Sequence, residues 1–81
     1  MNKDGDISGR EVLARNVKKY RKLAKMSQTV LANHCEIELS QISRIELSKI
    51  NTTVETIFLI AKALGIKPSQ LLEQDRTEVY S

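Results

Sequence analysis

The placement of helix-breaking residues constrains this chain more than any other feature of its sequence. No glycine or proline occurs between residues 10 and 64; proline occurs once, at Pro68, and glycine only at positions 5, 9 and 65. Because glycine and proline are the strongest local signals that interrupt regular structure, nothing in this long stretch forces a break. The alternation of apolar and polar residues that a half-buried strand requires is confined to residues 36–39. The pattern predicts an all-α domain.

Apolar residues recur at intervals of three and four positions, as on one face of a helix. This periodicity divides the chain into five predicted helices, which cover about 10–25, 28–35, 39–46 and 54–64, with a short fifth helix from Pro68. Ser27 and Thr53 are suitable N-cap residues, and Gly65 suits the left-handed position that ends a helix.

A chain of 81 residues makes a single small domain. We expect a flexible lead-in over residues 1–9, the folded domain over 10–73, and a polar tail over 74–81.

The composition excludes several classes of site. One cysteine and one histidine provide neither a disulfide framework nor a multi-thiolate zinc site, so no metal or cofactor is expected. Cys35 is interpreted as a small buried apolar residue, with a redox-sensing thiol as the alternative, and His34 as a surface residue. The longest apolar run, Ile57–Ala61, is too short for a membrane span or a signal peptide, and a cytoplasmic protein is expected.

Charge is distributed unevenly along the chain. Residues 10–49 contain nine Lys or Arg and four acidic residues, a net charge of +5, whereas residues 1–9 and 50–81 each have a net charge of −1. A localised basic region suits a polyanionic partner such as nucleic acid. An ordinary solvated helix face is the alternative explanation.

Three groups of residues closely resemble the phage-repressor-like (XRE-type) helix-turn-helix family. They are Ser27-Gln28 through Leu31-Ala32, Ile42-Ser43-Arg44-Ile45-Glu46, and Thr56-Ile57 followed by residues 60–66. Their order and spacing match over about residues 13–72, and the size is similar to that of stand-alone regulators such as restriction–modification controller proteins. The resemblance implies a five-helix lambda-repressor-like domain that binds double-stranded DNA as a homodimer, with no small-molecule ligand evident.

The resemblance also implies roles for individual residues. The base-reading positions correspond to Glu38, Leu39, Ser40 and Arg44, and the phosphate or backbone positions to Gln28, Gln41, Ser43 and Lys49. An arginine such as Arg44 suits a bidentate contact to guanine, and Leu39 suits a thymine methyl group. The alternatives are a surface ion pair of Arg44 with Glu38 or Glu46, and an ordinary exposed role for Gln28.

A structural ion pair between Arg21 and Glu46 is implied by the same resemblance. It would tie the first helix to the end of the third.

The sequence departs from the family pattern at the turns. Glu36 stands where the turn of the motif usually has glycine, and Glu38 stands where a Ser or Thr cap is common. The loop after the third helix has Leu47-Ser48-Lys49 in place of Asn-Gly before a basic residue, and Thr52 replaces a common proline. These departures leave the turn geometry and the base preference open.

The fourth helix is apolar on more than one side, which predicts a dimer interface formed by Phe58, Ile66, Leu71 and Leu72. The alternative is that the tail, through Val79 and Tyr80, covers this surface within one chain.

The basic region and the family resemblance together indicate a sequence-specific transcriptional regulator as the expected function. An interaction module such as an autoregulatory antitoxin is the alternative, and an enzyme is disfavoured because no nucleophile–base pair or phosphate-binding glycine loop is visible.

Overall fold

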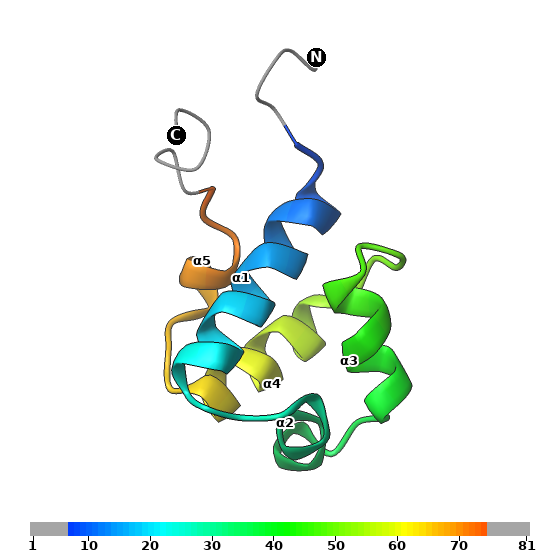
Figure 1. Ribbon diagram of the computed structural model, residues 1–81. Helices are drawn as coiled ribbons and strands as arrows, with labels where there is room; N and C mark the ends of the chain where they lie inside the picture. Colours follow the sequence, from blue (N-terminus) through cyan, green and yellow to red (C-terminus); the bar gives the residue numbers. More distant parts are fainter. Residues whose placement is uncertain (1–6, 75–81) are drawn as a thin grey trace.

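The computed structural model describes residues 7–74, which form five helices and no strand, as the all-α prediction requires (Figure 1). The predictions for residues 1–6 and 75–81, including the covering role of Val79 and Tyr80, lie outside the described residues. The helices are α1 (Gly9–Leu23), α2 (Gln28–Cys35), α3 (Leu39–Glu46), α4 (Val54–Leu64) and α5 (Pro68–Leu71).

Helix α1 begins one residue earlier than the sequence pattern suggested. The Ser8 hydroxyl oxygen accepts a hydrogen bond from the Glu11 amide (3.2 Å), and the Glu11 carboxylate accepts one from the Ser8 amide (3.2 Å). This reciprocal capping box satisfies two amides that would otherwise lack partners, so Ser8 and Gly9 belong to the folded domain and not to the lead-in. The helix ends at Leu23 because Lys25 adopts a left-handed conformation, with φ of 59°.

Helices α2 and α4 begin directly after their capping residues. The hydroxyl oxygens of Ser27 and Thr53 each accept a hydrogen bond from the amide three residues later, both at 3.1 Å. Gly65 is left-handed after α4, and Pro68 lies in the first turn of α5. Local sequence is sufficient to place these ends.

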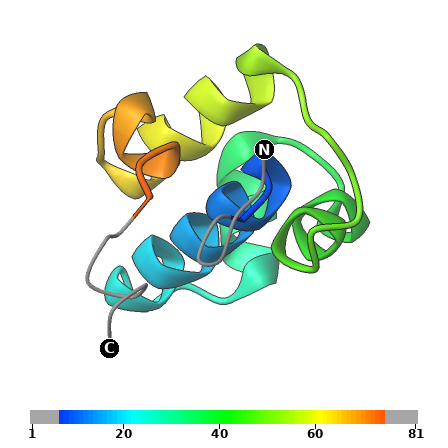
Figure 2. The same ribbon diagram turned by 90° about the horizontal axis from the view of Figure 1, so that it is seen from above.

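An aliphatic core lies between the helices. Helix α1 contacts both α3 and α5, α2 packs against α3 and α4, and α4 packs against α5. Figure 2 shows α1 between α5 on one side and α3 on the other. The largest fully buried side chains come from all five helices: Val17, Leu31, Ile42, Ile45, Ile60 and Leu71.

A buried amide attaches the end of the described chain to α1. Asn16 is 5% exposed, and its side-chain nitrogen donates to the carbonyl oxygens of Leu71 (2.9 Å) and Glu73 (2.8 Å). These bonds hold the segment after α5 against α1.

The turn between α2 and α3 keeps a left-handed residue although no glycine is present. Glu36 has φ of 58° and ψ of 42°. The Ile37 amide donates to the Ala32 carbonyl (3.1 Å), and the Glu36 amide donates to that of Asn33 (3.2 Å), so the last carbonyls of α2 are satisfied. Glu36 therefore adopts the left-handed conformation that the glycine usual in this family would adopt. Because Glu36 has a Cβ atom, this conformation carries backbone strain.

We expect Glu36→Gly to stabilise the domain by about 0.5–1 kcal/mol, because the relief of left-handed strain exceeds the entropy that glycine adds to the unfolded chain. Urea denaturation followed by circular dichroism measures this change. Glu36→Ala is the matched control, since it removes the carboxylate but keeps Cβ. Equal stabilisation by both variants would show that charge, and not backbone conformation, is responsible.

Candidate nucleic-acid interface

Helix α3 presents a polar face to solvent opposite its buried face. At 100° per residue, Ile42, Ile45 and Glu46 point inward. The predicted base-reading residues Leu39, Ser40 and Arg44 are exposed, and Gln41 and Ser43 are half-buried. The structure therefore brings the sequence-predicted residues of α3 together on one accessible surface.

Arg44 is available for a ligand. Within residues 7–74 its guanidinium makes no hydrogen bond or ion pair, so neither Glu38 nor Glu46 neutralises it. Lys49 is also exposed, in the turn directly after α3, where its amide donates to the Arg44 carbonyl (2.9 Å). Both cations can therefore meet an anionic surface without first breaking a contact within the described chain.

Glu38 is the N-cap residue of α3 by its backbone, with φ of −71° and ψ of 143°, but its side chain makes no capping hydrogen bond. Its exposed carboxylate lies at the end of α3 where free amides favour negative charge. It adds a negative charge to a surface that is otherwise positive or neutral.

A buried ion pair ties α1 to the end of α3. The Arg21 Nε lies 2.7 Å from Glu46 Oε2, and the Arg21 Nη2 donates to Glu46 Oε1 at 2.9 Å. The side chains are 12% and 2% exposed, and Arg21 Nη1 also donates to the Met26 carbonyl (2.9 Å). The pair implied by the family resemblance is thus present in a bidentate, shielded form.

Gln28, the first residue of α2, is attached to this ion pair. Its side-chain nitrogen donates to Glu46 Oε1 at 2.9 Å, and the side chain is half-buried. Sequence reasoning assigned Gln28 to a phosphate and missed this partner. The two residues are eighteen positions apart, on different helices, so no local pattern reveals the contact.

The pKa of Glu46 is lowered. Burial by itself would raise it, but the hydrogen bonds from Arg21 and Gln28, with the positive charges of Arg21 and Lys18, outweigh that effect. Glu46 is therefore ionised at neutral pH and acts only as a hydrogen-bond acceptor.

The pKa of Glu46 is lower in the folded protein than in the unfolded chain. Its stabilising contribution is therefore complete when the pH is above the unfolded-state pKa, and it is lost as the pH falls through the folded-state pKa. We expect the free energy of unfolding of the wild type to decrease below about pH 5, and the decrease to be smaller in Glu46→Gln. Urea unfolding at a series of pH values measures both slopes. Glu55→Gln, which removes an exposed carboxylate, is the control; identical slopes in wild type and Glu46→Gln would contradict the assignment.

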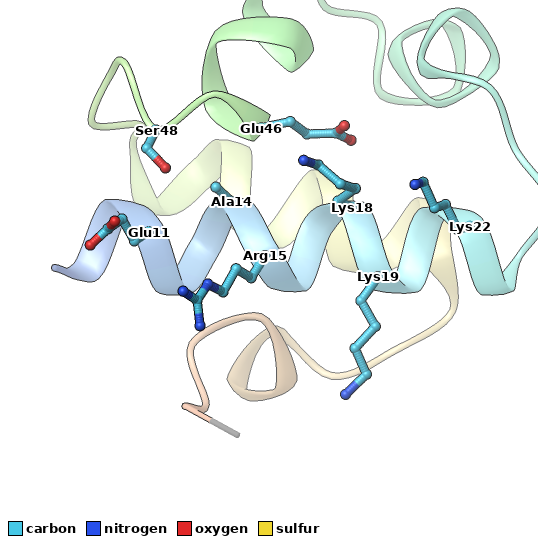
Figure 3. A pocket seen from close by; sticks show the side chains of 8 residues that line it. All are labelled: Glu11, Ala14, Arg15, Lys18, Lys19, Lys22, Glu46 and Ser48. Carbon is cyan, nitrogen blue, oxygen red and sulfur yellow. The ribbon is translucent and has the colours of Figure 1, made fainter. Parts of the chain in front are cut away.

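A pocket of about 400 Å³ lies between α1 and the end of α3 (Figure 3). In the figure, Lys18 and Lys22 extend to the side of α1 on which Glu46 lies, whereas Arg15 and Lys19 extend to the other side. The lining residues are Glu11, Ala14, Arg15, Lys18, Lys19, Lys22, Glu46 and Ser48. Lys18 and Lys22 thus place positive charge on the side of α1 that faces the end of α3.

Apolar side chains are also exposed on α4, in the loop that follows it and directly after α5. Phe58 and Leu72 are more than half exposed, and Ile66 is half-buried. Leu71, which the sequence pattern assigned to the same interface, is 0% exposed and belongs to the core, so that assignment was wrong. An open pocket of about 300 Å³ is lined by Glu55, Phe58, Leu59, Lys62, Ile66 and Pro68.

The remaining candidate groups are placed as follows. Cys35 is buried, and burial raises the pKa of its thiol, which makes the reactive thiolate scarce. His34 is exposed on α2. Among residues 7–74 no three His, Cys, Asp or Glu side chains gather as a metal site would require. In the same part of the chain, no helix combines the length and the apolar character needed to span a membrane.

Comparison with known proteins adds independent information. Residues 17–71 match the HTH_3 family, described as Helix-turn-helix. Control protein C.SmaI of Serratia marcescens is 35% identical over 63 residues, which are 78% of this chain and 75% of that protein. Control protein C.BamHI of Bacillus amyloliquefaciens is 40% identical over 50 residues, 62% of each chain.

Two solved structures share the fold. The hypothetical transcription factor NHTF from Neisseria superposes with a TM-score of 0.83 at 29% identity, over 99% of this chain and 90% of that chain. The restriction–modification controller protein C.AhdI from Aeromonas hydrophila has a TM-score of 0.74 at 24% identity, over 76% and 94%. The overall arrangement of the helices is thus a fold that other chains also adopt.

Proposed function

The chain belongs to the HTH_3 helix-turn-helix family, and we propose that it is a transcriptional regulator that binds a palindromic operator as a homodimer with α3 in the major groove. The observation that carries the proposal is the exposed face of α3, where Arg44 has no partner within the described residues. The two control proteins among its relatives, C.SmaI and C.BamHI, support a regulatory role.

The positions of these side chains support two kinds of DNA contact, one to base edges and one to phosphates. Arg44, Ser40 and Leu39 face the base edges, with Arg44 suited to the O6 and N7 atoms of a guanine. Lys49 at one end of α3 and Gln28 at the start of α2 contact phosphates, which position the helix without reading sequence. Lys18 and Lys22 of α1 extend the basic surface beside them.

Selection from random duplexes tests this function. We expect a salt-dependent mobility shift and enrichment of a palindrome whose half-sites lie about one helical turn, roughly 34 Å, apart. Recovery of unselected sequence at all salt concentrations would contradict sequence-specific binding, and the absence of any shift would contradict DNA binding itself.

Dimerisation is proposed through the apolar surface of α4 and α5, which is defined by Phe58, Leu59, Ile66 and Leu72. A single helix-turn-helix unit presents few base-reading side chains, so two copies are needed for a long operator. The surface lies on helices that do not carry the base-reading residues, and a second copy can bury Phe58 symmetrically.

We expect Phe58→Gln to weaken dimerisation at least about tenfold, because each copy loses an apolar side chain that is buried only in the dimer. Sedimentation equilibrium across micromolar concentrations measures the association constant. Leu23→Gln is the matched control, since Leu23 is also a large exposed apolar residue and lies at the end of α1, away from the proposed interface. A wild type that remains at monomer mass throughout would contradict the proposed dimer.

A further inference from the structure

Glu46 connects three helices through a single carboxylate. It lies at the last residue of α3, and its Oε1 accepts hydrogen bonds from both Arg21 of α1 and Gln28 of α2, each at 2.9 Å. Glu46 is 5% exposed, whereas Gln28 reaches it from the half-exposed first residue of α2. The Glu46 end of the contact is therefore buried, and the Gln28 end lies at the surface.

The chemistry of the two groups determines how the Gln28 amide is oriented. A primary amide has two N–H donors and a carbonyl acceptor, whereas an ionised carboxylate only accepts. Glu46 must therefore face the Gln28 nitrogen, and the second N–H of that nitrogen is left for another acceptor. Without Glu46 the long side chain would sample several rotamers and both amide orientations.

We propose that Glu46 is a positioning residue for DNA binding, which holds the Gln28 amide at the start of α2 so that its second N–H meets a backbone phosphate. The inference rests on the proposed function. It assigns Glu46 a task beyond the ion pair with Arg21, because the same carboxylate that ends the base-reading helix also orients a phosphate contact on the neighbouring helix. The two contacts of the helix-turn-helix unit with DNA are thereby linked by a hydrogen bond.

The proposal differs from two simpler roles for the same residue. If Glu46 only stabilised the fold, any effect of its removal on DNA affinity would be the same with and without the Gln28 side chain. If Glu46 instead competed with phosphate for the Gln28 amide, its neutralisation would increase DNA affinity. Each role gives a distinct pattern of affinities.

A double-mutant cycle in DNA affinity separates these roles. We expect Gln28→Ala to weaken binding to the selected operator about tenfold, as the loss of a hydrogen bond to a charged group would. Glu46→Gln should weaken binding by a smaller factor, because the new amide keeps a carbonyl acceptor but no longer forces the Gln28 nitrogen to face it. In the Gln28→Ala background, Glu46→Gln should cause no further loss of affinity, although it still lowers the stability measured by urea unfolding. Val17→Ala, a core variant outside the network, is the control that lowers stability without changing affinity.

Two results would overturn the proposal: equal losses of affinity from Glu46→Gln with and without the Gln28 side chain, or tighter binding by Glu46→Gln.

A second measurement needs neither DNA nor a variant. In an NMR acid titration of the free protein, the Gln28 side-chain amide signals should shift with the protonation of Glu46, and signals that do not follow it would exclude the contact. This titration remains informative if the protein binds no DNA, so failure of the positioning role and failure of the proposed function are distinguishable.

Discussion

Replacing Arg21 with Met is expected to lower the free energy of unfolding by about 3–5 kcal/mol, because it leaves the Glu46 carboxylate buried without its charged partner. The side chains of the pair are 12% and 2% exposed, so water cannot replace the missing guanidinium easily. The Arg21 hydrogen bond to the Met26 carbonyl is lost as well. Urea denaturation at neutral pH measures the change.

The double variant Arg21→Met with Glu46→Leu is the informative control. Removing both charges leaves neither one buried alone, so the double variant should be more stable than Arg21→Met. A double-mutant cycle with no coupling between the two positions would contradict a buried pair and would indicate a surface pair of little energetic consequence.

Arg44→Ala is expected to weaken binding to the selected operator by about 1–3 kcal/mol and to relax the preference at one base pair. The reason is that Arg44 is the exposed cation on α3 best suited to a bidentate contact with guanine. Affinity for the operator and for single-base variants of it, measured by mobility shift at fixed salt, checks both parts.

Lys49→Ala provides the comparison. A phosphate contact carries no base information, so this variant should weaken all duplexes alike and reduce the slope of log affinity against log salt by about one. An Arg44→Ala protein that bound its operator as tightly and as selectively as the wild type would show that α3 does not read the sequence.

Much of the backbone was predictable because the signals that set it are local. Serine and threonine caps lie directly before the helices they start, and Gly65 follows the helix it ends. Helical periodicity was sufficient to predict which residues of α3 are exposed, whereas the DNA contacts that the resemblance implies for them stay predictions. The start of α1 was also available locally, since Ser8 and Glu11 have the spacing of a capping box.

The apolar residues of the C-terminal half were harder to assign. Leu71 and Leu72 are adjacent and chemically identical, yet Leu71 is fully buried and Leu72 is 55% exposed. Which of them enters the core depends on how α5 packs against α1 and α4, and Asn16 helps to set that position through the Leu71 carbonyl. Periodicity cannot supply this information for a helix of four residues.

The sequence by itself determined an all-α chain, its five helices and the face of α3 that carries Arg44, because capping and periodicity act over a few residues. Only the tertiary structure decided that Gln28 shares Glu46 with Arg21, since this contact depends on the packing of three helices. It also decided that Glu36 keeps a left-handed turn in place of glycine, because the packed helices on either side impose the backbone path and outweigh the local preference of the residue.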